Sequence, residues 1–136
     1  QSSQTNSVTL RPIPRDIPTG ENISPASLSI ETEHDHYPLS TTEVKITITN
    51  HSHYEYECGE KYSLAYYNKS KRQWETLPTD PVVNDILWVF PPEHPSHQQT
   101  IKLYTSESPN HPGKYRIYKS FNRGTKVAYG EFELLP

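Results

Sequence analysis

The amino-acid sequence predicts an all-β fold, a β-sandwich of seven or eight short antiparallel strands with an extended N-terminal leader. Short segments alternate apolar with polar residues, as strands with one buried face do, and turn signals separate them about every 8 to 12 residues. The 136 residues include thirteen prolines and ten tyrosines. Proline disrupts helices, whereas tyrosine suits a half-buried pleated surface. We therefore expect one domain without long helices.

The first two strands are expected in residues 27–33 and 42–50. Both segments alternate apolar with polar side chains, and the second does so most cleanly, with Val44, Ile46 and Ile48 on one face. A sheet buries the face that carries such residues. These two segments should therefore supply part of the core.

The middle of the chain predicts an interrupted strand and a hairpin. Aromatic and apolar residues alternate on both sides of Gly59, which indicates a bulge or turn at that position. The polar residues 68–72 are typical of a hairpin tip, and residues 73–77 form the returning strand.

A proline-rich segment follows the hairpin. Residues 78–95 hold five prolines around the apolar run 86–90. Because proline is confined to strand edges and bulges, we expect a loop whose short helical turn or short strand packs the apolar run against the core.

Three more strands are expected towards the C-terminus. Residues 100–104, 114–121 and 126–135 alternate again, and residues 122–125 have the composition of a hairpin turn between the last two. Gly130 interrupts the alternation of the last strand, which indicates a bulge.

Residues 1–26 form the expected leader or linker, ahead of a sandwich domain in residues 27–136. The chain starts at Gln1 and contains no methionine, so we expect a processed or truncated start. A polar leader is typical of an exported chain after signal removal, or of one that follows a lipid-anchoring cysteine, and an arbitrary cut would look the same. We expect an exported protein of the periplasm or cell surface, with a lipid anchor as one alternative.

The net charge and the cysteine content limit the kinds of partner and cofactor that we expect. Thirteen Lys and Arg against sixteen Asp and Glu give a net charge of −3, so the chain lacks the cationic excess that nucleic-acid phosphates require. One cysteine, Cys58, cannot form an internal disulfide or a cysteine-rich metal site. We expect a monomer that binds no nucleic acid and uses no cofactor.

Several motifs occur together in a fixed order: EVKITITN at 43–50, YSLAYY at 62–67 followed by WETLP at 74–78, PGKYRI at 112–117, and EFEL at 131–134. As a set they resemble bacterial immunoglobulin-like domains of exported and lipoprotein-type proteins, over residues 27–135. The resemblance implies an immunoglobulin-like β-sandwich, an envelope location and no catalysis. The leader and residues 80–97 depart from it.

Two aromatic residues have expected structural roles in such a sandwich. Pro112 and Gly113 predict a tight turn, after which Tyr115 could bond its hydroxyl back to the loop backbone as a tyrosine corner does. Trp74 is expected to be a buried indole that packs between the two sheets.

Histidine pairs are weak candidates for metal ligands. His34 with His36, and His51 with His53, have the spacing that places two imidazoles on one face of a strand. Each pair flanks a turn and no third ligand is identifiable, so we interpret them as surface residues and expect no metal site.

The sequence also lacks catalytic signatures. Cys58 has the surroundings of a small buried hydrophobic residue, and the chain contains no Gly-x-Ser-x-Gly elbow and no glycine-rich phosphate loop. We therefore expect a non-enzymatic interaction or structural module.

Aromatic residues in excess of a small core permit a binding hypothesis. Tyr67, Trp88 and Tyr118 are the candidates, for contact with a protein or for stacking on sugar rings. One alternative function is thus a carbohydrate-binding module, and another is a small proteinase inhibitor that presents the proline-stiffened loop 80–97.

Overall fold

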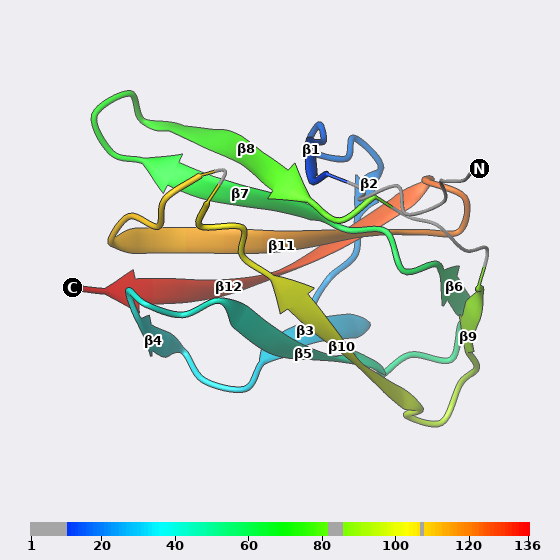
Figure 1. The fold of residues 1–136 in the computed structure, drawn as a ribbon. Helices are drawn as coiled ribbons and strands as arrows, with labels where there is room; N and C mark the ends of the chain where they lie inside the picture. The colour runs from blue at the N-terminus through cyan, green and yellow to red at the C-terminus, as the bar shows by residue number, and fades with distance from the viewer. Residues whose placement is uncertain (1–10, 82–85, 107) are drawn as a thin grey trace, which may run out of the picture.

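The computed structural model describes residues 11–81, 86–106 and 108–136, and every regular element in these ranges is a β-strand (Figure 1). The expected all-β fold is confirmed. The strands are β1 (Ile13–Pro14), β2 (Glu21–Asn22), β3 (Leu28–Thr32), β4 (His36–Pro38), β5 (Glu43–Asn50), β6 (Tyr56–Cys58), β7 (Ser63–Asn68), β8 (Gln73–Thr79), β9 (Trp88–Phe90), β10 (Ser96–Lys102), β11 (Gly113–Phe121) and β12 (Lys126–Leu135).

Two sheets face each other. The seven-stranded sheet has the order β1-β8-β7-β11-β12-β2, with β4 also paired to β12, and the three-stranded sheet has the order β10-β5-β3. The short pair β6 and β9 lies at the end of the sandwich away from the C-terminus (Figure 1). All pairings are antiparallel except those of β2 and β4, which run parallel to β12.

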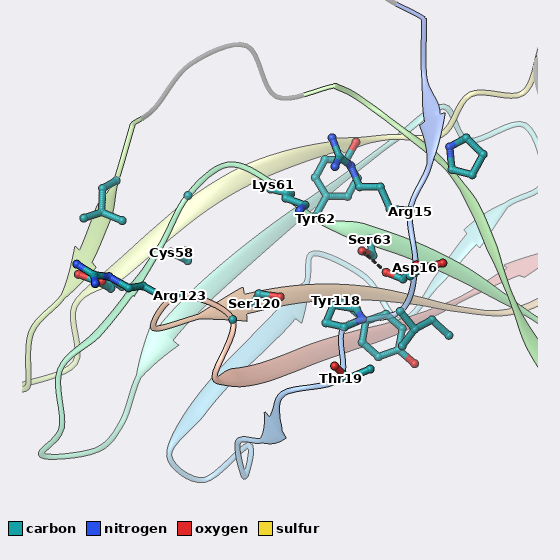
Figure 2. Close-up of a pocket in the computed structure, with 17 residues that line it drawn as sticks. Arg15, Asp16, Thr19, Cys58, Lys61, Tyr62, Ser63, Tyr118, Ser120 and Arg123 are labelled. Atoms are coloured by element: carbon teal, nitrogen blue, oxygen red, sulfur yellow. Dashed lines mark hydrogen bonds between the residues drawn. The ribbon is translucent and has the colours of Figure 1, made fainter.

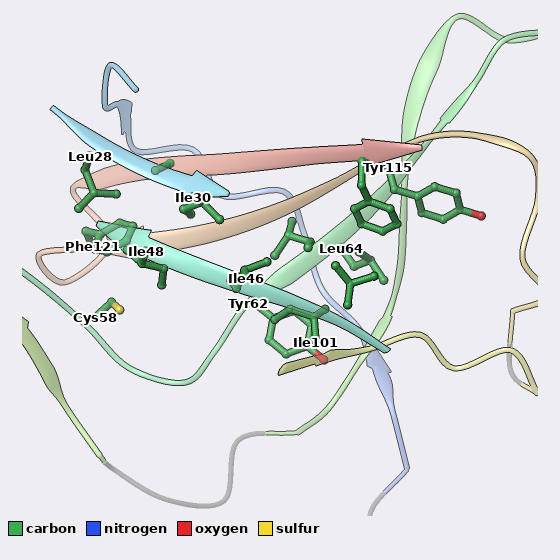
Figure 3. Packing of buried hydrophobic residues seen from close by; sticks show 14 of the residues in the cluster. Leu28, Ile30, Ile46, Ile48, Cys58, Tyr62, Leu64, Ile101, Tyr115 and Phe121 are labelled. Carbon is green, nitrogen blue, oxygen red and sulfur yellow. The ribbon is translucent and has the colours of Figure 1, made fainter. Parts of the chain in front are cut away.

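The core lies between the two sheets. Val44, Ile46 and Ile48 of β5 are buried, and the side chains between them are partly or fully exposed, as the alternation predicts. Ile46 and Ile48 point towards Leu64 of the opposite sheet (Figure 3), and Ile117 of that sheet belongs to the same buried cluster. Because burial of each large aliphatic side chain contributes about 1.5 to 3 kcal/mol, this alternation is the main reason that the strands hold their register.

The leader partly joins the seven-stranded sheet. Residues 13 and 14 pair with the end of β8, and residues 21 and 22 pair with the start of β12. Between them the side chain of Ile17 packs against a small cluster on the outer face of the sheet. None of the described residues belongs to a helix that could cross a bilayer.

Three expected elements differ from the structure. The single strand expected on both sides of Gly59 is two separate strands, because β6 pairs with β9 whereas β7 pairs with β8 and β11. The strand expected at residues 100–104 begins earlier, because β10 pairs with β5 from Ser96 onward. The bulge expected at Gly130 is wrong, since β11 and β12 pair without interruption and Gly130 stands opposite Ile117. Glycine is needed there for another reason: a Cβ would lie 2.6 Å from the carbonyl oxygen of Ile30 in β3.

Candidate functional site

Aromatic side chains gather on the outer face of the seven-stranded sheet. Alternation and register bring them together, because Tyr67 stands opposite Trp74 and Tyr118 stands opposite Tyr129 in neighbouring strands. We use the term aromatic face for a set of six residues on β7, β8, β11 and β12. These are Tyr67, Trp74, Arg116, Tyr118, Tyr129 and Glu131.

Arg116 lies at the centre of the aromatic face. Its guanidinium carbon is 4.2 Å from the ring centroid of Trp74 and 4.2 Å from that of Tyr129. Its Nε donates to Glu131 Oε2 at 2.6 Å, and its Nη1 donates to the Tyr118 hydroxyl at 3.2 Å. The guanidinium is therefore fixed by two rings and two hydrogen bonds, and each cation–π contact contributes about 0.5 to 1 kcal/mol at an exposed site.

The side chain of Arg116 also remains protonated. Burial alone would lower the pKa of Arg116, but its hydrogen bonds to Tyr118 and Glu131 outweigh that effect, so the pKa lies above its ordinary value. The group is thus a permanent cation with a carboxylate partner, held in place on a sheet surface.

The members of the aromatic face differ in exposure. Tyr129 is 41% exposed, Tyr67 and Trp74 are half-buried, and Tyr118 is buried. Tyr118 therefore supports the face from below, and the others present it to solvent. By contrast, the outer positions of the three-stranded sheet carry Lys45, Thr47, Gln98 and Thr100.

The structure brings only two of the three predicted binding residues together. Tyr67 and Tyr118 share the aromatic face, but Trp88 lies on β9, where its ring centroid is 3.8 Å from that of His97. Arg116 was not singled out from the sequence, although its position two residues before Tyr118 on a strand puts it on the same face.

The expected place of Trp74 between the sheets is wrong. Trp74 packs from outside against a small cluster that contains Ala65 and Tyr118, on the face opposite the main core. The reason is register: Trp74 pairs with Tyr67, which points outward, while Leu64 and Leu77 on the same two strands pack on the inner side.

Tyr115 makes the bonds that a tyrosine corner requires. Its hydroxyl donates to the carbonyl of His111 at 3.0 Å and accepts from the amide of the same residue at 2.8 Å. The ring is buried and stacks on Phe132, and burial raises the pKa of Tyr115.

Three of the four histidine candidates contact different partners. His34 packs edge-on to Tyr37, His36 is 3.6 Å from Glu133, and His51 bonds to the hydroxyl of Ser29 at 2.8 Å. His53 is exposed. Within the described ranges no three His, Cys, Asp or Glu side chains are grouped so that they could hold a metal ion.

The structure also contains a buried charged residue, Lys119, that the sequence did not suggest as a site residue. Lys119 of β11 has no solvent exposure, and its Nζ donates to the carbonyl of Gly59 at 2.7 Å and to Gln99 Oε1 at 2.9 Å. Burial lowers the pKa of Lys119 to about 8. Nearby Cys58 is a free, buried thiol whose pKa is raised by burial.

Comparisons with known proteins give one matching family and several solved chains. A family model described as a bacterial Ig-like domain matches residues 24–133. A comparison with curated proteins finds no match. Six solved chains match, among them Pseudomonas fluorescens alkylpurine DNA glycosylase AlkC bound to DNA containing an abasic site analog, at 14% sequence identity and a TM-score of 0.46. That match covers 82% of this chain and 31% of the other, and likeness at this level carries no argument about function.

Proposed function

The chain belongs to the bacterial Ig-like domain family, and we propose on that premise that it is a non-enzymatic module of the bacterial cell envelope that binds a protein through its aromatic face. The family supports a structural or interaction module. The observation that carries the proposal is the guanidinium of Arg116 held between the rings of Trp74 and Tyr129.

The residue types of the aromatic face favour a protein partner. Trp, Tyr and Arg are the residues most often responsible for binding energy at protein interfaces. Here the rings and the guanidinium are already fixed by mutual contact, so little side-chain entropy would be lost on binding. Arg116 keeps Glu131 as its partner, so docking would not leave an unpaired buried charge.

Carbohydrate binding has less support than protein binding. Sugar rings stack on free aromatic faces, but the guanidinium of Arg116 covers one face each of Trp74 and Tyr129. Tyr118 is buried, and the ring of Trp88 packs at a tilt against His97, with the ring centroids 3.8 Å apart. A glycan array should therefore show no binding that depends on these aromatic residues.

Proteinase inhibition through loop 80–97 also has less support. Residues 82–85 of that loop lie outside the described residues. In the described part, Phe90 is buried, and Asn50 Nδ2 donates to the carbonyls of Phe90 and Pro91 at 2.9 and 3.3 Å. The segment around Phe90 and Pro91 is thus held against the sandwich and is not presented as a free loop. We therefore expect no inhibition of serine or cysteine proteinases.

The location and the oligomeric state are part of the same proposal. We propose export to the periplasm or cell surface, with a lipid anchor as the alternative. We propose a monomer that binds no nucleic acid. Fractionation of cells that express the full open reading frame would test the location.

Matched surface variants test the proposed function. The protein and its variants are immobilised, and bound envelope proteins are quantified by mass spectrometry. Trp74→Ala and Arg116→Ala should each lose a bound protein that Thr100→Ala, on the outer side of the three-stranded sheet, retains. Equal recovery by all three variants would contradict the proposal, provided that circular dichroism shows each of them to be folded.

A further inference from the structure

We infer that the cleft between the leader and the β6–β7 segment binds an acidic peptide segment of a protein partner. The cleft has a volume of about 770 Å³, which is within the usual range of ligand sites. Residues 14–19 form one wall, and residues 57–59 and 61–63 with Leu87 form a second (Figure 2). The third wall consists of Tyr118, Ser120, Arg123 and Gly124. Of these residues only Tyr118 is shared with the aromatic face.

The leader wall is fixed in place. Arg15 Nε donates to Thr79 Oγ1 at 2.9 Å, and its Nη2 donates to the carbonyl of Asp80 at 3.2 Å. The hydroxyl of Ser63 donates to the carbonyl of Asp16 at 3.1 Å, and Ile17 packs against the sheet. A wall that is held before binding reduces the entropy lost when a ligand enters.

Two cations in the cleft are available to a ligand. Lys61 and Arg123 are exposed and line different walls (Figure 2), and neither takes part in an ion pair with another described residue. By contrast, the cations of β12 and of the aromatic face already have partners, Glu21 for Lys126 and Glu131 for Arg116.

The acidic side chains of the cleft do not cancel these cations. Asp16 and Glu57 also line it, against three cations that include Arg15, so the lining keeps a positive excess in a chain whose net charge is −3. A ligand that carries carboxylates complements Lys61 and Arg123, which are at the two separate walls.

The backbone at Arg123 is an independent indication of a role for its side chain. Arg123 has φ 58°, between Asn122 at 52° and Gly124 at 83°, in the left-handed region that favours glycine. Asn122 is fixed there by Glu57, whose amide donates to Asn122 Oδ1 at 3.0 Å. An arginine where glycine would fit more easily is a strained choice for the fold, and such strain often marks a functional position.

The lining favours a peptide over an anionic sugar polymer. The rings of Tyr62 and Tyr118 are buried, so they offer no open face for sugar stacking. Leu87 is 57% exposed at the edge of the cleft and supplies apolar contact beside the cations. Carboxylates together with apolar side chains are the combination that an acidic peptide provides.

A fluorescein-labelled peptide of alternating Glu and Leu tests the inference by anisotropy, with its Gln-for-Glu analogue as the neutral control. We expect saturable binding of the acidic peptide that weakens as salt is raised, and weak binding of the analogue. Arg123→Gly and Lys61→Gln should each weaken binding about threefold to fivefold, as loss of one exposed charge contact does. Lys45→Gln, on the three-stranded sheet, should bind like the unmodified protein.

Arg123→Gly also distinguishes a loss of binding from a loss of folding. Glycine relieves the left-handed conformation, so this variant should melt at the same or a higher temperature while it loses affinity for the peptide. Unchanged binding in Arg123→Gly and Lys61→Gln would overturn the inference, as would equal binding of the neutral analogue. Tighter binding of polygalacturonate than of the acidic peptide would also overturn it. Trp74→Ala should leave peptide binding intact, so failure here is distinguishable from failure of the aromatic-face proposal.

Discussion

The ammonium group of Lys119 donates to the backbone carbonyl of Gly59 at 2.7 Å from a position without solvent exposure. A second bond goes to Gln99 Oε1 at 2.9 Å, so one buried cation connects β11 to the β6–β7 corner and to β10. Cys58 and Glu60 act to raise the pKa of Lys119, but burial outweighs both. Such a group should make the stability of the domain depend on pH.

The first prediction concerns the pH dependence that Lys119 causes. Burial lowers its pKa from 10.5 to about 8 in the folded chain. Between pH 8 and pH 10.5 the unfolded chain binds a proton at this residue that the folded chain does not. The contribution of Lys119 to the free energy of unfolding therefore rises with pH over this range. Relative to Lys119→Met, the unmodified protein should gain up to roughly 3 kcal/mol in free energy of unfolding between pH 8 and pH 10.5.

Urea denaturation of both proteins at several pH values measures this difference. Taking the difference also removes most of the opposite effect of Cys58, whose raised pKa reduces stability above the ordinary thiol pKa. A difference that stays flat between pH 8 and pH 10.5 would show that Lys119 does not titrate in this range.

The second prediction concerns the corner made by Tyr115. Tyr115→Phe removes the hydroxyl that donates to the His111 carbonyl and accepts from its amide. We expect a loss of about 1 kcal/mol in free energy of unfolding, because a partly buried donor and acceptor lose their partner. Tyr66→Phe is the matched control, since its hydroxyl makes one exposed bond of 3.3 Å to the carbonyl of Pro112. Equal losses in the two variants would contradict the special role of Tyr115.

The third prediction concerns the approach of β3 to β12. In Gly130→Ala the new Cβ would lie 2.6 Å from the carbonyl oxygen of Ile30, so one of the strands must move. The expected cost is about 1 to 3 kcal/mol in free energy of unfolding. Gly59→Ala is the control, because the nearest atom to its Cβ would be 3.5 Å away, and it should change stability by less than about 0.5 kcal/mol. Similar midpoints for both variants in thermal melts would refute this explanation of Gly130.

Much of the fold could be predicted because it depends on local alternation. Val44, Ile46 and Ile48 identify a strand and its buried face without knowledge of the partner strand, and the all-β class follows from several such segments. The family was indicated by the resemblance of the ordered motifs and is confirmed by the family model. The corner at Tyr115 was predictable for the same reason, since its bonds go to a residue only four positions away.

Features that depend on how strands pair and pack with one another could not be predicted. Whether Trp74 faces the core or the solvent is decided by its register with Tyr67, and the role of Gly130 is decided by β3, a hundred residues earlier in the chain. The aromatic face itself needs Trp74 of β8 and Tyr129 of β12 on either side of Arg116. The sequence suggested Tyr67 and Tyr118, but not the arginine that joins the rings.

We propose that the aromatic face contacts a protein partner in the cell envelope. Photo-crosslinking in living cells tests it most directly, with a benzoyl-phenylalanine placed at Tyr129 on the aromatic face or at Thr100 on the three-stranded sheet. Both positions are exposed, so neither replacement has to enter the core. We expect a discrete crosslinked protein from position 129 that position 100 does not give. The same protein crosslinked from both positions, or from position 100 alone, would contradict it.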